Sequence, residues 1–165
     1  MSSFIKKAFD CKEDMGSLSC GGLIKPRLLS CGKGEKAIFV GPDNPSVIIG
    51  RVLVDAGNII RPTVSIEFSS IVSFLATNED AEGELKFSLF RACSNQSIEL
   101  LNSWSYEIFR IDDRNDGMRF TDSFSFNYCD SLCEAQCCKY LVEVSIESLS
   151  TANIVVNNVH ITAVV

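Results

Sequence analysis

An alternation of apolar and polar residues runs through most of this chain and restricts it to β structure. From Pro26 onward the side chains repeat with a period of two, as in Thr63–Ser69, Glu84–Phe90 and Ser103–Ile108. Successive side chains of a strand point to opposite faces of a sheet, so this pattern produces one apolar and one polar face. Antiparallel sheets that are covered on one side have such strands. The sequence therefore predicts an all-β domain.

Turn-rich stretches divide this pattern into about eight segments of strand length. The chain has 165 residues, of which 46% are hydrophobic and 11 are phenylalanine. A chain of this size forms one domain with a sizeable core. We expect residues 26–165 to form an eight-stranded antiparallel β-sandwich. A jelly roll is the favoured topology, because its two inner faces share one core that accommodates many aromatic side chains.

Residues 1–25 differ from the rest of the chain and are predicted to form an N-terminal extension. Apolar residues near the start recur at helical spacing, which is typical of one or two amphipathic turns. These residues are Phe4, Ile5, Ala8 and Phe9. A glycine- and serine-rich stretch follows around Cys20, so this part is expected to be flexible. Two interpretations stay open, namely a frayed terminus and a connector arm that docks on a neighbouring subunit.

Charge and hydropathy argue against two classes of partner. The net charge is −6 and there is no basic run, so the surface is expected to repel the phosphates of nucleic acid. No apolar run has the length of a membrane-spanning helix, and no signal peptide of the Sec type is expected. Eight cysteines suit an oxidising compartment. Either they bind metal or stay free, or the protein reaches such a compartment by another route, such as lysis of the cell that made it.

Half of the cysteines lie in one short segment, which reads YCDSLCEAQCCKY at 128–140. Four thiolates at such spacings could bind a tetrahedral zinc ion. That weaker alternative would use Cys129, Cys133, Cys137 and Cys138. Disulfides are favoured over zinc, because two adjacent cysteines seldom reach the same ion.

The adjacent pair is predicted to serve two different purposes. In a strand, Cys138 would be in phase with Tyr140 and Val142 and would face the core. Cys137 would then face outward, where it could reach another chain. Cys138 and Cys93 are also candidates for buried free thiols.

No set of side chains proposes a reaction. His160 is the only histidine, and it lies in an alternating segment with no obvious catalytic partner, which indicates an exposed strand residue. Trp104 is expected in the core or at its rim, since one aromatic residue is a weak indication of a sugar-stacking site. We therefore expect no enzymatic activity and no cofactor.

Five stretches of the sequence are distinctive. They are PRLLSCG at 26–32, VSIEFSS at 64–70, GELKFSLFRACSNQ at 83–96, DSFSFNYCDSLCEAQCCKYLVEV at 122–144 and VVNNVHITAVV at 155–165. Together they resemble an uncharacterised family of small, cysteine-rich β domains encoded by spore-forming anaerobic bacteria. Members often carry one more cysteine soon after the position of Cys129, where this chain has Asp130-Ser131-Leu132. The family resemblance implies no reaction.

The layout is also similar to that of the pilin-like subunits of endospore appendages, which are jelly-roll domains with a cysteine-bearing N-terminal connector. This similarity implies a structural, self-assembling subunit of a spore-surface or extracellular fibre. Such a subunit is made without a signal peptide in the mother cell and is oxidised later. Its partner would be a further copy of itself, joined head to tail, and other spore-surface proteins are additional candidate partners.

The fibre hypothesis divides the cysteines into two groups. Candidates for disulfides between subunits are Cys11, Cys20, Cys31, Cys129, Cys133 and Cys137. Candidates for buried or intrachain cysteines are Cys93 and Cys138. Two alternatives remain, a discrete surface module that binds a glycan or a protein, and a zinc-stabilised intracellular β domain.

Overall fold

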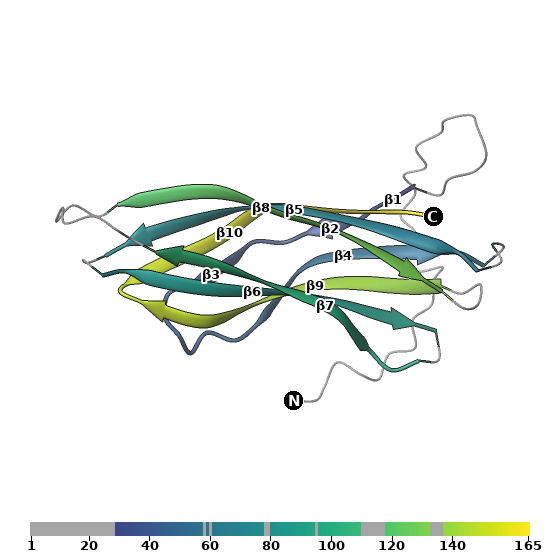
Figure 1. Ribbon diagram of the computed structural model, residues 1–165, viewed down its shortest axis with the longest axis horizontal. Coiled ribbons are helices and arrows are strands. Elements are labelled where there is room, and N and C mark those ends of the chain that lie inside the picture. Colours follow the sequence, from purple (N-terminus) through teal and green to yellow (C-terminus); the bar gives the residue numbers. More distant parts are fainter. Residues whose placement is uncertain are drawn as a thin grey trace.

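The chain folds into two antiparallel β-sheets that lie face to face as an elongated sandwich (Figure 1). The computed structural model describes residues 29–57, 59, 61–77, 80–94, 96–109, 118–132 and 137–165. Ten strands lie within these ranges, which hold no helix that could cross a membrane. The predicted arm at 1–25 is outside the described residues.

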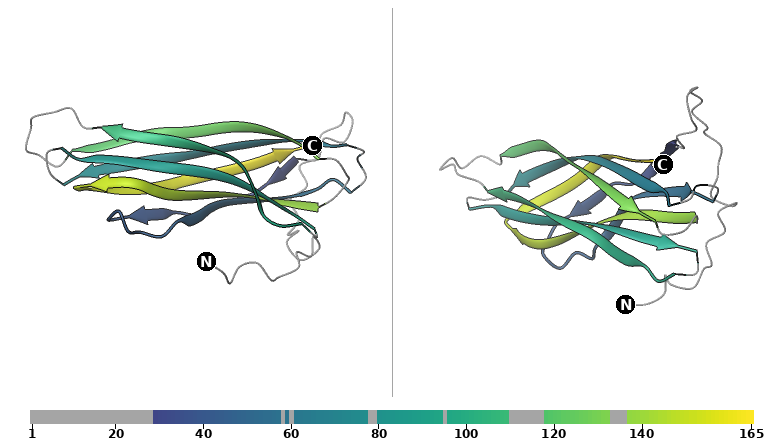
Figure 2. Two further views of the ribbon diagram at one scale, coloured as in Figure 1. Left: turned by 60° about the horizontal axis from the view of Figure 1, so that its bottom comes forward. Right: turned by 45° about the vertical axis from the view of Figure 1, so that its right-hand side comes forward.

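The strands fall into two sheets of five. Their bounds are β1 (Leu29–Cys31), β2 (Lys33–Gly34), β3 (Ala37–Phe39), β4 (Val47–Asp55), β5 (Thr63–Ala76), β6 (Glu82–Cys93), β7 (Glu99–Phe109), β8 (Arg119–Ser131), β9 (Cys137–Ser150) and β10 (Ala152–Val164). Sheet A has the order β1-β10-β5-β8, and β3 also pairs with β10. Sheet B has the order β2-β4-β9-β6-β7. Figure 2 shows the two layers from two further directions.

The all-β class and the two-sheet sandwich are confirmed, but the number of strands is larger than predicted. About eight were expected, and ten form. The difference arises at the start of the domain, where β1, β2 and β3 are separate pieces of three, two and three residues. Strands were expected at Arg27–Cys31 and Lys36–Val40, which contain β1 and β3. β2 has only two residues and cannot show an alternation, so only its backbone pairing with β4 defines it as a strand.

The long strands extend beyond the limits that the alternation suggested. β5 was expected to end at Ser69 but continues to Ala76. Ser70 is buried at an inward position and interrupts the apolar pattern there. The inward row then resumes with Val72 and Phe74, both buried. Because this one polar residue interrupts the alternation, the sequence predicted only half of the strand.

The two inner faces share one apolar core, in which aromatic rings connect the sheets. Its largest fully buried side chains include Tyr140, Phe39, Phe87, Ile49 and Ile66. The ring centroids of Trp104 on β7 and Phe126 on β8 are 3.9 Å apart and stacked. Phe87 on β6 stacks on Phe124 of β8 at 4.0 Å. These contacts close the side of the sandwich that is bounded by the edge strands β7 and β8.

The opposite side is closed by the chain itself, which passes from sheet A to sheet B at Gly32. The Gly32 amide donates to the Ile161 carbonyl of sheet A, and the Glu35 amide donates to the Ile49 carbonyl of sheet B. A Cβ atom added at Gly32 or Gly34 would overlap backbone carbonyl oxygens of the facing strands. Glycine is therefore required here because the backbones approach so closely.

Candidate functional site

The cysteine-rich segment lies at one end of the sandwich, where β8 ends and β9 begins. Cys129 is near the end of β8, and Cys137 and Cys138 are the first residues of β9. β6 ends beside them with Cys93. This end of the molecule therefore gathers cysteines from three strands and both sheets, and it is the candidate functional site.

Cys93 and Cys138 form a disulfide inside the core. They face each other directly in the antiparallel pairing of β6 with β9. Their S–S distance is 2.04 Å, and the bond joins positions 45 residues apart. Both residues are buried. The structure thus places Cys138 on the inner face and gives it a covalent partner on the neighbouring strand.

A buried polar network lies next to this disulfide and connects the two sheets. Asp130 on β8 of sheet A is 7% exposed. Arg91 Nη1 on β6 donates to both carboxylate oxygens of Asp130 at 2.8 Å. The hydroxyl of Tyr140 on β9 donates to Asp130 Oδ2 at 2.8 Å. A buried carboxylate is costly unless it is paired and hydrogen-bonded, and Asp130 fulfils both conditions.

One end of this hydrogen-bond network faces the solvent. Arg91 Nη2 donates to Glu99 Oε2 on β7 at 2.6 Å, and the Glu99 side chain is 58% exposed. The Arg91 guanidinium therefore bridges a buried and an exposed carboxylate. This arrangement keeps its charge compensated although the side chain is only 16% exposed.

Tyr140 and Arg91 are each held in one protonation state near neutral pH, because the pKa of both groups is raised. Burial raises the pKa of the Tyr140 hydroxyl, and the hydrogen bond to Asp130 raises it further. Burial lowers the pKa of the Arg91 guanidinium, but its hydrogen bonds to Asp130 and Glu99 outweigh this effect, so the pKa lies above its ordinary value. Tyr140 is therefore neutral and Arg91 charged near neutral pH. The network is suited to holding two sheets together.

Within the part of the chain that the structure describes, two cysteines are exposed and free. They are Cys31 on β1 and Cys129 on β8. Cys137 takes part in a disulfide and is half-buried. The other three candidates for disulfides between subunits lie outside the described residues, namely Cys11, Cys20 and Cys133.

Both free cysteines lie on the outer face of sheet A, at its opposite edges. Cys31 is paired with Thr162, whose neighbours Ile161 and Ala163 are buried, so this row faces outward. Cys129 alternates with the buried Asp130 and also faces outward. The order β1-β10-β5-β8 puts three strand spacings between them, which is about 14 Å. This is too far for a disulfide within one chain.

The described residues do not bring together a set of metal ligands or a set of catalytic side chains. In that part of the chain no three His, Cys, Asp or Glu side chains converge on a position for a metal ion. The zinc alternative would need Cys138, whose sulfur is bonded to Cys93. His160 is exposed on β10. One face of the Trp104 ring is covered by Phe126, which leaves less of it for a sugar.

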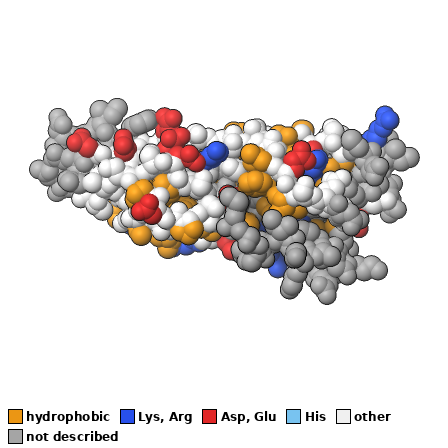
Figure 3. Space-filling view, turned by 90° about the horizontal axis from the view of Figure 1, so that it is seen from below, with side chains coloured by type: hydrophobic (Ala, Val, Ile, Leu, Met, Phe, Trp, Pro, Cys, Tyr) orange, Lys and Arg blue, Asp and Glu red, His pale blue; other side chains and the backbone are white. Residues whose placement is uncertain are grey.

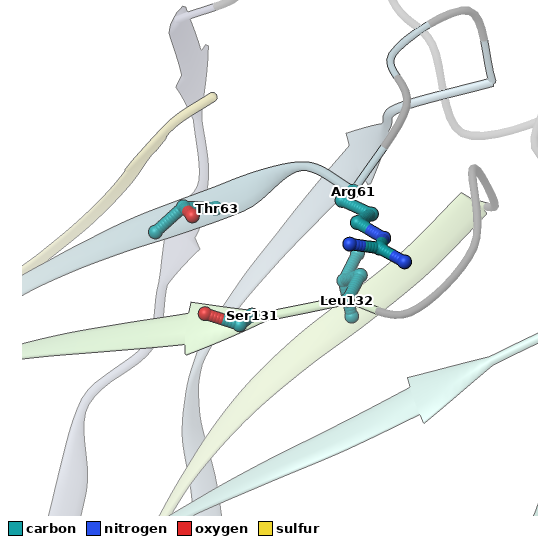
Figure 4. Close-up of a pocket in the computed structure, with 4 residues that line it drawn as sticks. All are labelled: Arg61, Thr63, Ser131 and Leu132. Atoms are coloured by element: carbon teal, nitrogen blue, oxygen red, sulfur yellow. The ribbon is translucent and has the colours of Figure 1, made fainter.

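A shallow hollow lies at the same end of the sandwich. The hollow is lined by Arg61, Thr63, Ser131 and Leu132 (Figure 4). Thr63 and Ser131 are paired across β5 and β8, and no two of the four side chains form an acid–base pair. On the face drawn in Figure 3, the described Lys and Arg side chains are scattered among acidic and uncharged ones.

Sequence reasoning missed the Arg91–Asp130 pair, although a signal was present. Asp130 is in phase with Phe126 and Tyr128, and Arg91 is in phase with Leu89. Side chains two residues apart in a strand share a face, so the sequence places both Asp130 and Arg91 on the inner faces. A charged residue at an inward position of each strand indicates an ion pair in the core.

Comparison with known proteins gives a family but no function. No curated protein matches the chain. A solved structure described as Eiger TNF from S. frugiperda has 10% sequence identity and a TM-score of 0.36, with 85% of this chain and 92% of that chain covered. A structure of infectious bursal disease virus, Gx strain, has 11% identity and a TM-score of 0.39, with 89% of this chain and 42% of that chain covered. A family model matches residues 25–165, and the chain therefore belongs to the DUF4489 family, a domain of unknown function.

Proposed function

We propose that this domain is a structural subunit that assembles with copies of itself into a fibre on a spore surface or outside the cell, with disulfides between subunits. The observation that carries the proposal is the open edge of sheet A at β8. β8 pairs with β5 over its full length of 13 residues, without a register shift. Among the described residues no strand pairs with its other side.

Natural monomers protect such edges. They use lysine, proline, bulges or short strands to prevent pairing with another chain. β8 reads RFTDSFSFNYCDS, which contains no lysine and no proline, and its pairing with β5 is regular. Its two charges at inward positions, Asp130 and Asp122, accept hydrogen bonds from Arg91 and Tyr106 of sheet B, so both are engaged within the molecule. An edge of this length without these features is suited to adding a strand from another molecule.

We also infer that the sandwich is a jelly roll. The chain pairs β3 with β10, β4 with β9, β5 with β8, and β6 with β7. These pairs are nested around the β6–β7 connection, as they are when one long antiparallel hairpin is rolled into two sheets. A sandwich of this kind keeps edge strands on both sheets, which is compatible with assembly at the edges.

The first test is a denaturing gel of the full-length protein, boiled with and without reductant, combined with negative-stain electron microscopy. The proposal expects filaments and a ladder of high mass that collapses to monomer only after reduction. Monomer in both lanes together with an empty grid would contradict it.

A pair of variants tests whether the β8 edge is the assembly surface. Ser125→Lys/Asn127→Lys adds charge to exposed positions of β8, and we expect it to abolish or strongly shorten the filaments. Ser69→Lys/Ser73→Lys adds the same charge to the central strand β5, and it should leave them intact. Equal effects of both changes would show that charge, and not the edge, controls assembly.

A further inference from the structure

We propose that Cys31 of one copy and Cys129 of the next form a disulfide across paired edges of sheet A. The inference rests on the proposed self-assembly and adds to it the two edges that meet and the covalent bond between them. Both thiols are exposed and free, and they lie at opposite edges of one sheet. A second copy is therefore the partner that can bring the two thiols together without rearranging the sheet.

The two edges of sheet A are compatible in direction. β8 runs antiparallel to β5, β5 to β10, and β10 to β1 and β3. β8 is consequently antiparallel to β1 and β3. A copy shifted sideways without rotation would therefore place its β1 and β3 beside β8 in antiparallel orientation, and the sheet would continue from one subunit into the next. Such a contact is head to tail and does not close, so it propagates.

The edges also match in length. Through the registers of β5 and β10, Phe120 of β8 is in the same cross-strand row as Phe39 of β3. Cys129 is in the same row as Leu29 of β1. β8 thus spans the full distance that β1 and β3 cover together, and one subunit edge can accommodate the other.

The two thiols lie on the same face of sheet A. The cross-strand row that contains Cys31 is two residues away from the row that contains Cys129. Cys31 lies two residues beyond Leu29, whose row contains Cys129. A shift of two residues between neighbouring subunits, about 7 Å along the strands, puts the two cysteines directly opposite each other. A two-residue shift keeps every side chain on its original face. It also displaces each subunit along the strand direction.

The molecule already contains a disulfide of this kind. Cys93 and Cys138 occupy directly opposed positions of antiparallel strands and are bonded. Directly opposed residues have Cβ atoms about 5 Å apart, which is close to what a disulfide needs. The same geometry between β1 and β8 of two copies would permit the same bond.

The bond forms by oxidation of two thiols. With oxidised glutathione as oxidant, a thiolate of one copy attacks the glutathione disulfide and releases one reduced glutathione. The thiolate of the second copy then attacks the protein–glutathione mixed disulfide and releases the other. Two thiols lose two protons and two electrons, and one glutathione disulfide gains them.

Four samples of full-length protein, each oxidised with glutathione disulfide, test the pairing. They are the wild type, the Cys31→Ser variant, the Cys129→Ser variant and an equal mixture of the two variants. Each variant alone lacks one half of the pair, whereas the mixture carries the two halves on different chains. We expect the peptide that links Cys31 to Cys129 in the wild type and in the mixture, and in neither variant alone. Mass spectrometry of proteolytic fragments, prepared without reductant, identifies the linkage.

The outcomes separate this inference from the function on which it rests. Both side chains are exposed, so urea denaturation should show that each serine variant is as stable as the wild type. Covalent polymers that lack the Cys31–Cys129 peptide would overturn the pairing and leave self-assembly standing. A Cys129–Cys129 link in the Cys31→Ser variant would overturn the head-to-tail arrangement. Wild type that stays monomeric after oxidation would overturn both.

Discussion

The buried ion pair between Arg91 and Asp130 makes a quantitative prediction about stability. Asp130→Asn keeps the shape of the side chain and one oxygen that can accept from Tyr140, but it removes the negative charge. Removing one partner of a buried ion pair costs about 3–5 kcal/mol. The loss should be smaller here because Arg91 keeps Glu99 at 2.6 Å, although that carboxylate is 58% exposed. We therefore expect the free energy of unfolding to fall by about 2–3 kcal/mol.

The chain offers a matched control on the same strand. Asp122 of β8 also accepts a hydrogen bond from a tyrosine hydroxyl, that of Tyr106 at 3.2 Å, but it is exposed. Asp122→Asn should change the free energy of unfolding by no more than about 0.5 kcal/mol. The two variants thus make the same chemical change in a buried and in an exposed environment.

Urea denaturation followed by the fluorescence of Trp104, the only tryptophan, measures both variants. The ring stacks on Phe126 between the sheets, so its emission reports on separation of the two layers. Unchanged m-values are required for a direct comparison. If Asp130→Asn costs no more than Asp122→Asn, the network does not hold the sheets together and the reasoning is refuted.

Tyr140→Phe removes the hydroxyl but leaves the Arg91–Asp130 ion pair in place. It also tests how the stability depends on pH. Losing one hydrogen bond should cost about 1 kcal/mol. The folded-state pKa of Tyr140 is raised, so below the unfolded pKa of about 10 its contribution is fully present. Above that pH the unfolded chain releases the proton while the folded chain keeps it, and stability falls as pH rises. The wild type should therefore lose more stability than Tyr140→Phe between about pH 9 and about pH 11.

Three further changes test the covalent bond and the backbone. Cys93→Ala/Cys138→Ala removes a crosslink between positions 45 residues apart, and loop-closure entropy gives a loss of about 4 kcal/mol; an unchanged urea midpoint would contradict this. Thr151 has a φ of 46°, which is unfavourable for a β-branched residue, so Thr151→Asn should raise the thermal midpoint by relieving about 1 kcal/mol of strain. Gly34→Ala would place a methyl group on the Val159 carbonyl and should cost about 1–3 kcal/mol, whereas Gly41→Ala meets nothing within 4 Å and should be close to neutral in the same assay.

The candidate site was only partly accessible from the sequence. Cys138 was assigned inward because it is in phase with Tyr140, and the structure places it in the core. The same rule applied to Asp130 would have found a buried carboxylate. It would also have placed Arg91 inward, but it would not have shown that the two side chains meet, because Arg91 lies on another strand and in the other sheet. Which charged residue meets which depends on pairing between distant strands.

The alternation of apolar and polar residues was enough to predict strands and to assign their two faces. Backbone geometry alternates side chains along every strand, so a local pattern is sufficient to separate inner from outer positions. Strand order and register were needed to show that Cys93 lies opposite Cys138, and that Cys31 and Cys129 lie at opposite edges of sheet A. Strand order and register join residues far apart in the chain. Strand order and register depend on how the two inner faces fill one core, and a local sequence pattern does not contain that information.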